Sequence, residues 1–402
     1  MNRTESLIQK VEKYGAHNYH PLHVVLTRGR EAKVWDVEGK EYLDFLACYS
    51  ALNFGHQHPR LVKALINQLD KIAVCSRAFY AEPLSDYSEK LAKFCGLESV
   101  LPMNSGTEAV ETALKIARKW GYEKKKVGAG RAEIIAMDNS FHGRSIAVIS
   151  FSSEENYRAG FGPFVPGFPM VKYGDVSAIE AAIMPDTVGV ILEPVQAEAG
   201  ILIPPPGYLK QVRALCDKHN VLMIVDEIQT GMARTGKNFC YEHEGITPDL
   251  LILGKSLGGG LIPVSAVLAR KDIMDVIRPG QHGSTFGGNP LGCAVAMEAI
   301  DLMVEEDFSG KAQRIGEWVQ GGLKAQNLPK VKEIRGMGAL IGIELEVSAG
   351  GARRYTEKLA LEGVLCKETH DNVIRIAPPL VISESDVKIG VSKIIKVIRD
   401  LA

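Results

Sequence analysis

Two short runs decide the fold of this chain: Val221-Leu222-Met223-Ile224-Val225-Asp226-Glu227-Ile228-Gln229 and Asp249-Leu250-Leu251-Ile252-Leu253-Gly254-Lys255. Each is a continuous apolar run that leads into a charged residue. Runs of this length, rich in Val, Ile and Leu, are typical of strands that are covered on both faces. Because burying a charge is costly unless it is paired or neutralised, we expect Asp226 and Lys255 to have a chemical role.

The same alternation of short apolar runs and longer amphipathic stretches continues from about residue 100. It predicts strands at Glu133–Met137, Val188–Leu192, Leu222–Val225, Leu250–Leu253 and Val264–Ala269, and helices at Thr107–Trp120, Tyr208–His219 and Ile273–Ile277. This order indicates an α/β fold with a largely parallel sheet. Ligands of such sheets usually bind beyond the carboxyl ends of the strands, where Asp226 and Lys255 fall.

The two ends of the chain have a different pattern. Residues 32–44 are typical of a β-hairpin with its turn at Glu38-Gly39. The later elements are predicted at Pro290–Glu306, Ala312–Ala325, Gly338–Leu345, Arg354–Glu362 and Val373–Ala377. We therefore predict a large domain of residues 50–288 and a smaller α+β domain built from residues 1–49 and 289–402.

Composition excludes several classes of protein. The 402 residues are 46% hydrophobic and 24% charged, which is ordinary for a globular protein. A net charge of −1 does not favour nucleic acid or an anionic membrane as partner, and no apolar run is long enough to span a bilayer. The start lacks the layout of a signal peptide. Seven scattered cysteines without a Cys-x-x-Cys pair indicate no disulfide framework, so we expect reduced thiols and a cytoplasmic protein.

Lys255 and Asp226 are the residue types that a pyridoxal phosphate site requires. A buried lysine forms a Schiff base with an aldehyde, and an acid pairs with the pyridinium nitrogen. A third motif, Ser105-Gly106-Thr107, precedes a predicted helix. Backbone N–H groups and the helix dipole favour a phosphate there, although such a cluster by itself is more often an ordinary N-cap.

Other loops add weaker signals. Phe141 could stack on a planar ring and Arg144 could hold a carboxylate, or the loop could simply be capped around a core aromatic. Glu193 and Glu198, taken alone, are expected to be solvated. Thr285 could contact phosphate, but an ordinary interdomain loop is the simpler interpretation. The histidines at positions 17, 20, 23, 56 and 58 lack further ligands nearby, so no metal site is predicted.

Taken in order, these motifs resemble those of the class III pyridoxal phosphate-dependent aminotransferases along essentially the whole chain. The resemblance rests on the hairpin at 35–44, Gly55–Pro59, Asn104–Glu108, Phe141-His142-Gly143, Glu193-Pro194, Asp226–Gln229, Gly254-Lys255 and Ser284–Pro290. It implies the type I, aspartate aminotransferase-like fold, pyridoxal 5′-phosphate as cofactor, and transamination as activity.

The resemblance also implies a role for each cofactor-binding residue. Lys255 would bind the aldehyde and later move a proton, while Asp226 would keep the ring nitrogen protonated. Phe141 and Ile228 would cover the two ring faces. The implied cofactor-binding set is Ser105, Gly106, Thr107, Phe141, His142, Asp226, Ile228, Gln229, Lys255 and Thr285. Thr285 would come from the neighbouring subunit, which implies a homodimer or a larger assembly.

Within the family, the segments Tyr14–Leu22 and Cys48–Ala51 resemble members that act on ornithine. The implied substrate-binding residues are Tyr19, Tyr49, Arg144, Glu193, Glu198 and Arg375. Tyr49 would select a free α-amino group, and Arg375 would bind 2-oxoglutarate once released from Glu198. The products would be glutamate 5-semialdehyde and glutamate, as in proline and arginine metabolism. Two alternatives remain open: transamination of N-acetylornithine or another ω-amine, and a non-catalytic pyridoxal phosphate-binding protein.

Overall fold

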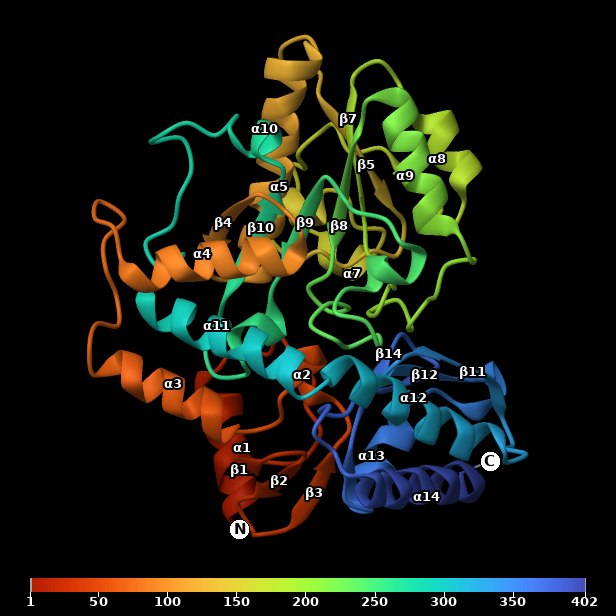
Figure 1. The fold of residues 1–402 in the computed structure, drawn as a ribbon. Coiled ribbons are helices and arrows are strands. Elements are labelled where there is room, and N and C mark those ends of the chain that lie inside the picture. Colours follow the sequence, from red (N-terminus) through yellow and green to blue (C-terminus); the bar gives the residue numbers. More distant parts are fainter. Residues whose placement is uncertain (1, 402) are drawn as a thin grey trace.

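The computed structural model describes residues 2–401. In that part of the chain, a seven-stranded sheet in the order β4-β10-β9-β8-β7-β5-β6 forms the centre of the larger half of the molecule (Figure 1). Its strands are β4 (Ser99–Met103), β10 (Ser265–Ala269), β9 (Leu250–Leu253), β8 (Leu222–Asp226), β7 (Thr187–Leu192), β5 (Glu133–Met137) and β6 (Met170–Val171). Only β10 runs antiparallel to its neighbours. The predicted strands and the largely parallel sheet are confirmed, whereas β4 and β6 were not predicted.

Strand β8 shows why the central strands must be apolar throughout. Leu222 and Ile224 pack in the core beneath α5 (Gly106–Trp120). The alternate residues Met223 and Val225 belong to the core on the opposite face, together with residues of α9 (Tyr208–His219). Successive side chains of a strand point to opposite faces, and here both faces are covered. Charged side chains can therefore follow such a strand only at its ends.

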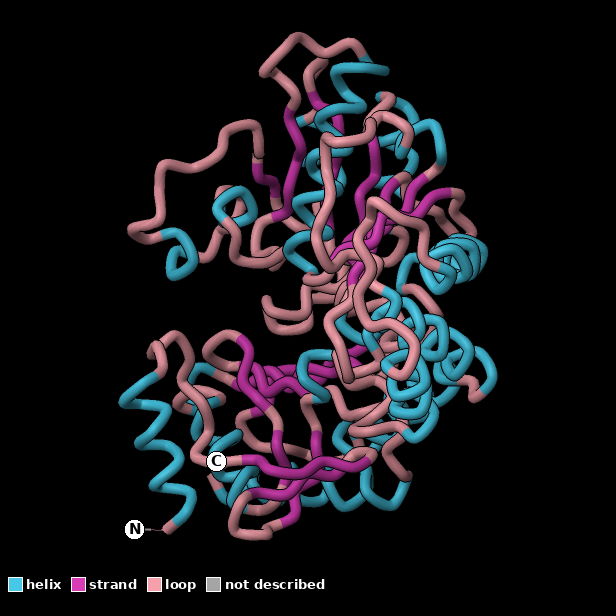
Figure 2. Tube along the Cα trace, turned by 90° about the vertical axis from the view of Figure 1, so that its left-hand side faces the viewer, coloured by secondary structure: helices cyan, strands magenta, loops and turns pink. Residues whose placement is uncertain are grey.

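Two four-stranded sheets form the other half of the molecule, which is the lower part in Figure 2. One contains β1 (Leu26–Arg30), β2 (Lys33–Asp36), β3 (Glu41–Asp44) and β13 (Val364–Leu365), and the other contains β11 (Val331–Met337), β12 (Leu340–Leu345), β15 (Val373–Ile376) and β14 (Lys367–Thr369). The parallel pair of β3 with β13 joins the two ends of the chain in one sheet. This pairing supports the domain division at residues 49 and 288, which we propose for this chain.

The remaining helices surround these sheets. They are α1 (Arg3–Tyr14), α3 (Pro59–Leu69), α4 (Glu82–Cys95), α6 (Ile146–Ile149), α7 (Glu155–Arg158), α8 (Val176–Ala182), α10 (Lys271–Met274), α11 (Pro290–Glu305), α12 (Phe308–Lys324), α13 (Arg353–Leu361) and α14 (Glu384–Asp400). The segment labelled α2 (Ala47–Ser50) has left-handed backbone angles and is described below. A π-helical turn at Gly121–Lys125 continues α5.

Three predicted boundaries are wrong for identifiable reasons. The helix predicted from Ala312 begins at Phe308, because the side chain of Asp307 caps it by accepting the backbone N–H of Gly310. The helix predicted at Ile273–Ile277 lies instead at Lys271–Met274. An acidic residue, Asp272, lies in its first turn, which the helix dipole favours. The strand predicted from Gly338 begins at Leu340, because Gly338 forms the tight turn after β11 with a φ of 53°. A glycine adopts that angle without a steric penalty.

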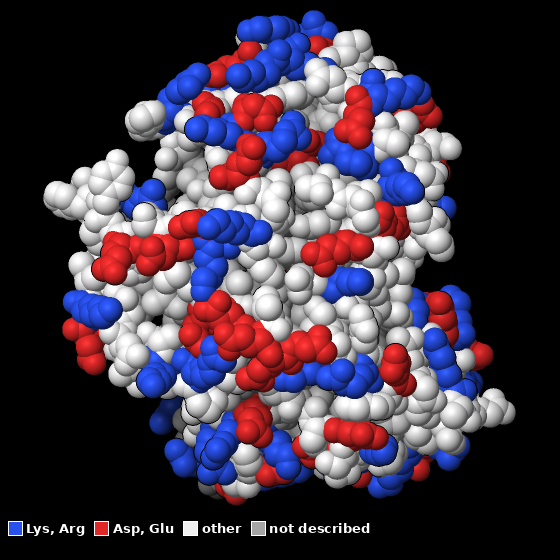
Figure 3. Space-filling model, viewed as in Figure 1, with Lys and Arg blue, Asp and Glu red and all other residues white. Residues whose placement is uncertain are grey.

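The surface agrees with the near-neutral net charge. On the face shown in Figure 3, basic and acidic side chains are interspersed and no broad region carries a single sign. Among the described residues, no helix combines the length and the apolar character that crossing a bilayer would need.

Helix α12 provides a test of the packing in the smaller half of the molecule. A methyl group at Gly316 would collide with the backbone carbonyl of Gly338, which cannot move aside as a side chain can. Gly316→Ala is therefore expected to lower the free energy of unfolding by about 1–3 kcal/mol, as overpacking does. The thermal midpoint measures this effect.

The matched control lies in the same helix. A methyl group at Gly321 would meet no described atom within 4 Å. Gly321→Ala should be neutral or stabilise the protein by up to about 1 kcal/mol through helix propensity. Equal shifts of the midpoint in the two variants would contradict the packing of α12 on the β11–β12 turn.

Candidate functional site

A cavity of about 330 Å³ lies at the carboxyl ends of the strands of the large sheet. It is lined by Tyr19, Ser105, Gly106, Thr107, Phe141, His142, Gly143, Arg144, Glu193, Asp226, Ile228, Gln229 and Lys255. Except for Gly143, every one of these residues was predicted from the sequence. Three more predicted residues, Tyr49, Glu198 and Arg375, form a cluster that Gln229 joins to the cavity.

Lys255 follows strand β9 and begins a short 3₁₀ turn. Burial lowers the pKa of its amine, while the carboxylates of Glu198 and Asp226 act in the opposite direction. The net shift is downward because a low-dielectric environment disfavours the charged form. A larger fraction of the amine is therefore neutral, which is the nucleophilic form.

Asp226 is the last residue of β8, and its carboxylate is fixed by two contacts. Oδ1 accepts a hydrogen bond from the backbone N–H of Ile228 at 3.0 Å, and Oδ2 lies 2.7 Å from Nδ1 of His142. Burial disfavours a charged His142, but the hydrogen bond and the charge of Asp226 outweigh it and raise the pKa of the imidazole. Nε2 of His142 is buried without a partner among the described residues. The pair thus presents a fixed carboxylate to the cavity.

Glu193 is buried, so the expectation of a solvated side chain is wrong for this residue. The loop after β7 folds inward, and Oε1 of Glu193 accepts the backbone N–H of Phe141 at 2.8 Å. Burial raises the pKa of Glu193 to about 8, against the opposing charge of His142. Near neutral pH, Glu193 is therefore mostly a neutral acid that can donate as well as accept a hydrogen bond.

The start of helix α5 is both an ordinary N-cap and part of the cavity wall, so both interpretations of its sequence apply. Ser105 is the N-cap of a capping box, in which the side chain of Glu108 accepts the backbone N–H of Ser105 at 2.7 Å. Ser105, Gly106 and Thr107 nevertheless line the cavity. An added methyl group at Gly106 would lie 2.9 Å from Cδ1 of Ile228, so the glycine lets Ile228 pack beside the helix start. The helix therefore presents its positive end to the cavity.

Gly143 is the cavity residue that the sequence analysis did not assign. Its φ is 121°, which few residues other than glycine adopt, and an added methyl group would collide with the side chain of Thr107. Its position after Phe141-His142 was visible in the sequence, but neither the angle nor the contact with Thr107 was.

Arg375 anchors the cluster beside the cavity. It is 1% exposed on strand β15, and it donates to Glu198 at 2.8 Å and to the amide oxygen of Gln229 at 2.7 Å. The Gln229 amide nitrogen donates to Glu198 at 3.0 Å. Burial opposes ionisation of Glu198, but the charge and hydrogen bond of Arg375 lower its pKa, so it is a carboxylate. Contrary to the expectation of a solvated acid, Glu198 neutralises a buried guanidinium.

Tyr49 completes this cluster, with its ring centroid 5.1 Å from Cζ of Arg375. Burial raises the pKa of the Tyr49 phenol, so its hydroxyl stays protonated. In the lining of the cavity, Cζ of Arg144 lies 5.8 Å from the ring centroid of Tyr19. The single chain does not bring Thr285 into the cavity; its side chain is exposed on the loop before α11.

Comparison with known proteins identifies the family. The family model described as aminotransferase class-III matches residues 14–398. The chain belongs to this family. Its members are pyridoxal phosphate-dependent transaminases, in agreement with the resemblance seen in the motifs. Among the described residues, no cluster of His, Cys, Asp and Glu suited to a metal ion is present.

Three relatives are similar to this class-III aminotransferase over nearly their whole length. The ornithine aminotransferase of Brevibacillus brevis is 52% identical over 399 residues, which cover 99% of each chain. The ornithine aminotransferase of Toxoplasma gondii, whose structure has partial occupancy of pyridoxal phosphate at the active site, is 42% identical over 99% of this chain and 94% of its own, with a TM-score of 0.97. The acetylornithine aminotransferase of Elizabethkingia anophelis is 45% identical over all of both chains, with a TM-score of 0.90.

The cavity residues fit pyridoxal phosphate. An amine with a lowered pKa suits its aldehyde, a buried carboxylate suits a protonated ring nitrogen, and the start of α5 suits its phosphate. The glycines at 106 and 143 let Ile228 and Thr107 pack closely in the cavity wall, because methyl groups there would press against those side chains.

The raised pKa of Glu193 gives a pH-dependent prediction for the cofactor-free protein. The carboxyl group has an ordinary pKa near 4.5 when unfolded and about 8 when folded. The unfolded chain thus loses this proton first, and stability falls as pH rises from about 4.5 to 8. Glu193→Gln, which can still accept the N–H of Phe141, removes that dependence.

The thermal midpoints of the two proteins should therefore diverge with pH. Between pH 5.5 and 8, the thermal midpoint of Glu193→Gln is expected to rise relative to that of the unsubstituted protein. A difference that stays constant over this range would show that Glu193 is not held neutral by burial.

Proposed function

We propose that this class-III aminotransferase moves the δ-amino group of L-ornithine to 2-oxoglutarate by a ping-pong mechanism. The products are L-glutamate 5-semialdehyde and glutamate. The observation that carries the proposal is the cluster beside the cavity, where Glu198 pairs with Arg375 at 2.8 Å and Tyr49 lies against the same guanidinium. The names of relatives such as the Brevibacillus brevis enzyme give independent support.

The charge of the substrate explains why this cluster suits ornithine. The reacting δ-carbon of ornithine carries no carboxylate, so an unpaired arginine beside it would repel the cationic amine without a compensating contact. Glu198 neutralises Arg375 during this half-reaction. In the second half-reaction, the α-carboxylate of 2-oxoglutarate takes the place of Glu198 on Arg375, because a bidentate arginine–carboxylate pair is a strong charge-assisted contact.

The α-carbon end of ornithine is held by residues of the cavity and of the neighbouring cluster. Arg144 binds the α-carboxylate, with Tyr19 beside it. Tyr49 accepts a hydrogen bond from the free α-amino group and leaves little room for an acyl group in its place. Together these residues orient ornithine with its δ-amine toward Lys255.

Bound pyridoxal phosphate supplies an aldehyde that exchanges amino groups and a ring that withdraws electrons from the reacting carbon. The amine of Lys255 would hold the aldehyde and would carry a proton to and from the substrate carbon. Asp226, held by His142, keeps the ring nitrogen protonated. Phe141 and Ile228 would cover the ring faces, Gln229 would bind the ring oxygen, and Ser105, Gly106 and Thr107 would hold the phosphate.

Assembly and cellular role follow from the same proposal. The enzyme would be a homodimer in which Thr285 of each chain contacts the phosphate bound by the other. Phe79, Tyr80 and Phe286 are exposed aromatic side chains, which supports an interface with a second copy. The reaction connects arginine and proline metabolism, and seven free cysteines are consistent with a cytoplasmic location.

A second candidate donor is N-acetylornithine, favoured by the 45% identity to the Elizabethkingia anophelis acetylornithine aminotransferase. An acetylated α-nitrogen carries no charge and adds bulk where Tyr49 is placed. The third interpretation is a non-catalytic protein that binds the cofactor. It does not explain why Arg144 and Arg375 are arranged near Lys255.

The donor is tested by single-turnover spectroscopy of the purified holoenzyme. L-Ornithine should convert the cofactor from its aldehyde to its amine form at least about tenfold faster than N-acetylornithine or 4-aminobutyrate does; tenfold corresponds to ~1.4 kcal/mol in activation free energy. Tyr49→Ile should reduce this preference. Faster conversion by N-acetylornithine in the unsubstituted enzyme would assign it to the second candidate function.

The role of Glu198 is tested by Glu198→Gln, which keeps the shape of the side chain but removes its charge. The charge of Arg375 would then be unneutralised in both half-reactions. The ornithine half-reaction should slow by about tenfold, ~1.4 kcal/mol, while the 2-oxoglutarate half-reaction is unchanged or faster. Rapid-mixing measurements of each half-reaction give the two rates. Equal losses in both would exclude a charge switch.

A further inference from the structure

Four consecutive residues beside the cavity have a left-handed backbone. The φ angles of Ala47, Cys48, Tyr49 and Ser50 are 46°, 46°, 58° and 70°, and none of the four is a glycine. Left-handed residues with side chains are unfavourable and usually occur singly. Such a run persists only where surrounding contacts hold it in place. The segment that holds Tyr49 against Arg375 is therefore strained and depends on its anchors.

The first anchor is Asp44, at the end of strand β3. Oδ1 of Asp44 accepts the backbone N–H groups of Leu46 at 2.9 Å and Ala47 at 2.8 Å. Oδ2 lies 2.9 Å from Nε2 of His56. Asp44 is buried, so these contacts replace water at both oxygens. The carboxylate thus holds the chain where it enters the left-handed run.

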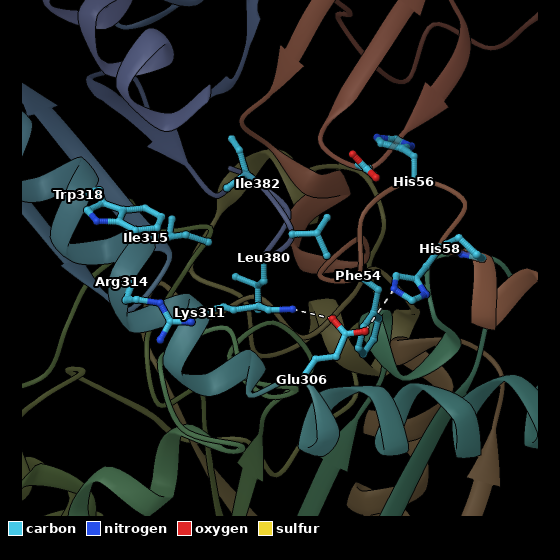
Figure 4. Close-up of a pocket in the computed structure, with 13 residues that line it drawn as sticks. Phe54, His56, His58, Glu306, Lys311, Arg314, Ile315, Trp318, Leu380 and Ile382 are labelled. Atoms are coloured by element: carbon cyan, nitrogen blue, oxygen red, sulfur yellow. Dashed lines mark hydrogen bonds and ion pairs between the residues drawn. The ribbon is translucent and has the colours of Figure 1, made fainter. Parts of the chain in front are cut away.

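His56 in turn is held from its other side. Its backbone exchanges two hydrogen bonds with Glu31, at 2.9 and 2.8 Å. Its ring packs against Gly29 of strand β1, where an added methyl group would lie 2.6 Å from the ring. Figure 4 shows His56 with His58 and Phe54 among the residues that line a second cavity, and none of these lines the cofactor cavity. His56 therefore acts on Asp44 and does not itself line the active site.

The second anchor holds the end of the run. The hydroxyl of Ser256, the residue after Lys255, donates to the carbonyl of Ser50 and accepts the N–H of Asn53 at 3.3 Å. The side chain of Asn53 is bound by the buried Arg234, whose Nε lies 3.1 Å from its Oδ1. The run that contains Tyr49 is thus fixed at one end by Asp44 and at the other by the neighbour of the reactive lysine.

We propose that Asp44 and His56 are positioning residues that hold the left-handed run and keep the Tyr49 ring against Arg375, and that they thereby set the preference for ornithine over its N-acyl derivative. This inference rests on the proposed function only for the identity of the donors. The anchoring of Tyr49 itself follows from the contacts of the described residues.

A double-mutant cycle tests whether His56 acts through Tyr49. The measured quantity is the ratio of kcat/KM for ornithine to that for N-acetylornithine. His56→Ala should lower this ratio by about tenfold in the unsubstituted enzyme, but by less than about twofold in Tyr49→Ile, because coupled residues do not act additively. Equal losses in both backgrounds would overturn the proposal.

Three further variants separate positioning from a loss of folding. His56→Gln, whose amide can donate to Asp44, should retain the ratio within about threefold. Gly29→Ala, which displaces the imidazole ring without removing it, should change the ratio in the same direction as His56→Ala. His219→Ala, at a partly buried histidine at the end of α9, should leave the ratio unchanged. A ratio that is unchanged in both His56→Ala and Gly29→Ala would contradict the proposal.

Hydrogen–deuterium exchange provides a readout that does not depend on the substrate. In holoenzyme with His56→Ala, peptides that cover residues 45–52 should exchange about tenfold faster, while peptides from β8 and β9 are unchanged. No change at 45–52, or an increase spread over the whole chain, would overturn the positioning role. If instead the unsubstituted enzyme rejects ornithine, the proposed function fails, whereas the exchange result still decides the anchoring.

Discussion

The buried charges at one edge of the large sheet are the constraint on which the rest of the structure depends. Strands β7, β8 and β9 are covered on both faces, so their charged neighbours can lie only beyond their ends. Parallel strands bring those ends together, and Glu193, Asp226 and Lys255 therefore meet in one cavity. Each isolated charge would cost several kcal/mol in such a place. This cost is reduced because Glu193 is neutral, because the pKa of Lys255 is lowered and because Asp226 is paired with His142.

Buried charges are also paired in the smaller half of the molecule. Arg375 is carried by β15, and it needs Glu198 and Gln229 from the large-sheet side to be buried. Tyr49 reaches this cluster on a left-handed run whose residues each cost about 1–2 kcal/mol. Strain of this kind is usually found at functional sites, where surrounding contacts maintain it. The site thus joins segments from both ends of the chain and from its middle, which explains why the substrate pocket needs the whole fold.

Local pattern was enough to predict much of this arrangement. The apolar runs identified the central strands within a residue of their ends, and the residues after them identified Asp226 and Lys255. Burial of Glu193 was missed because a loop acid looks the same in sequence whether it folds inward or outward. The left-handed backbone of Cys48 and Tyr49 could not be predicted either, since neither residue favours a positive φ angle by itself. The support from Asp44 and His56 depends on contacts between separate elements, which periodicity does not report.

We propose that Lys255 is the residue in this buried site that bonds to the cofactor. Borohydride reduction of the holoenzyme makes the bond between a lysine and pyridoxal phosphate permanent, and peptide mapping by mass spectrometry then locates it. We expect the modification to fall on the peptide that contains Lys255 and on no other lysine peptide. Modification of a different lysine, with the Lys255 peptide unchanged, would contradict it.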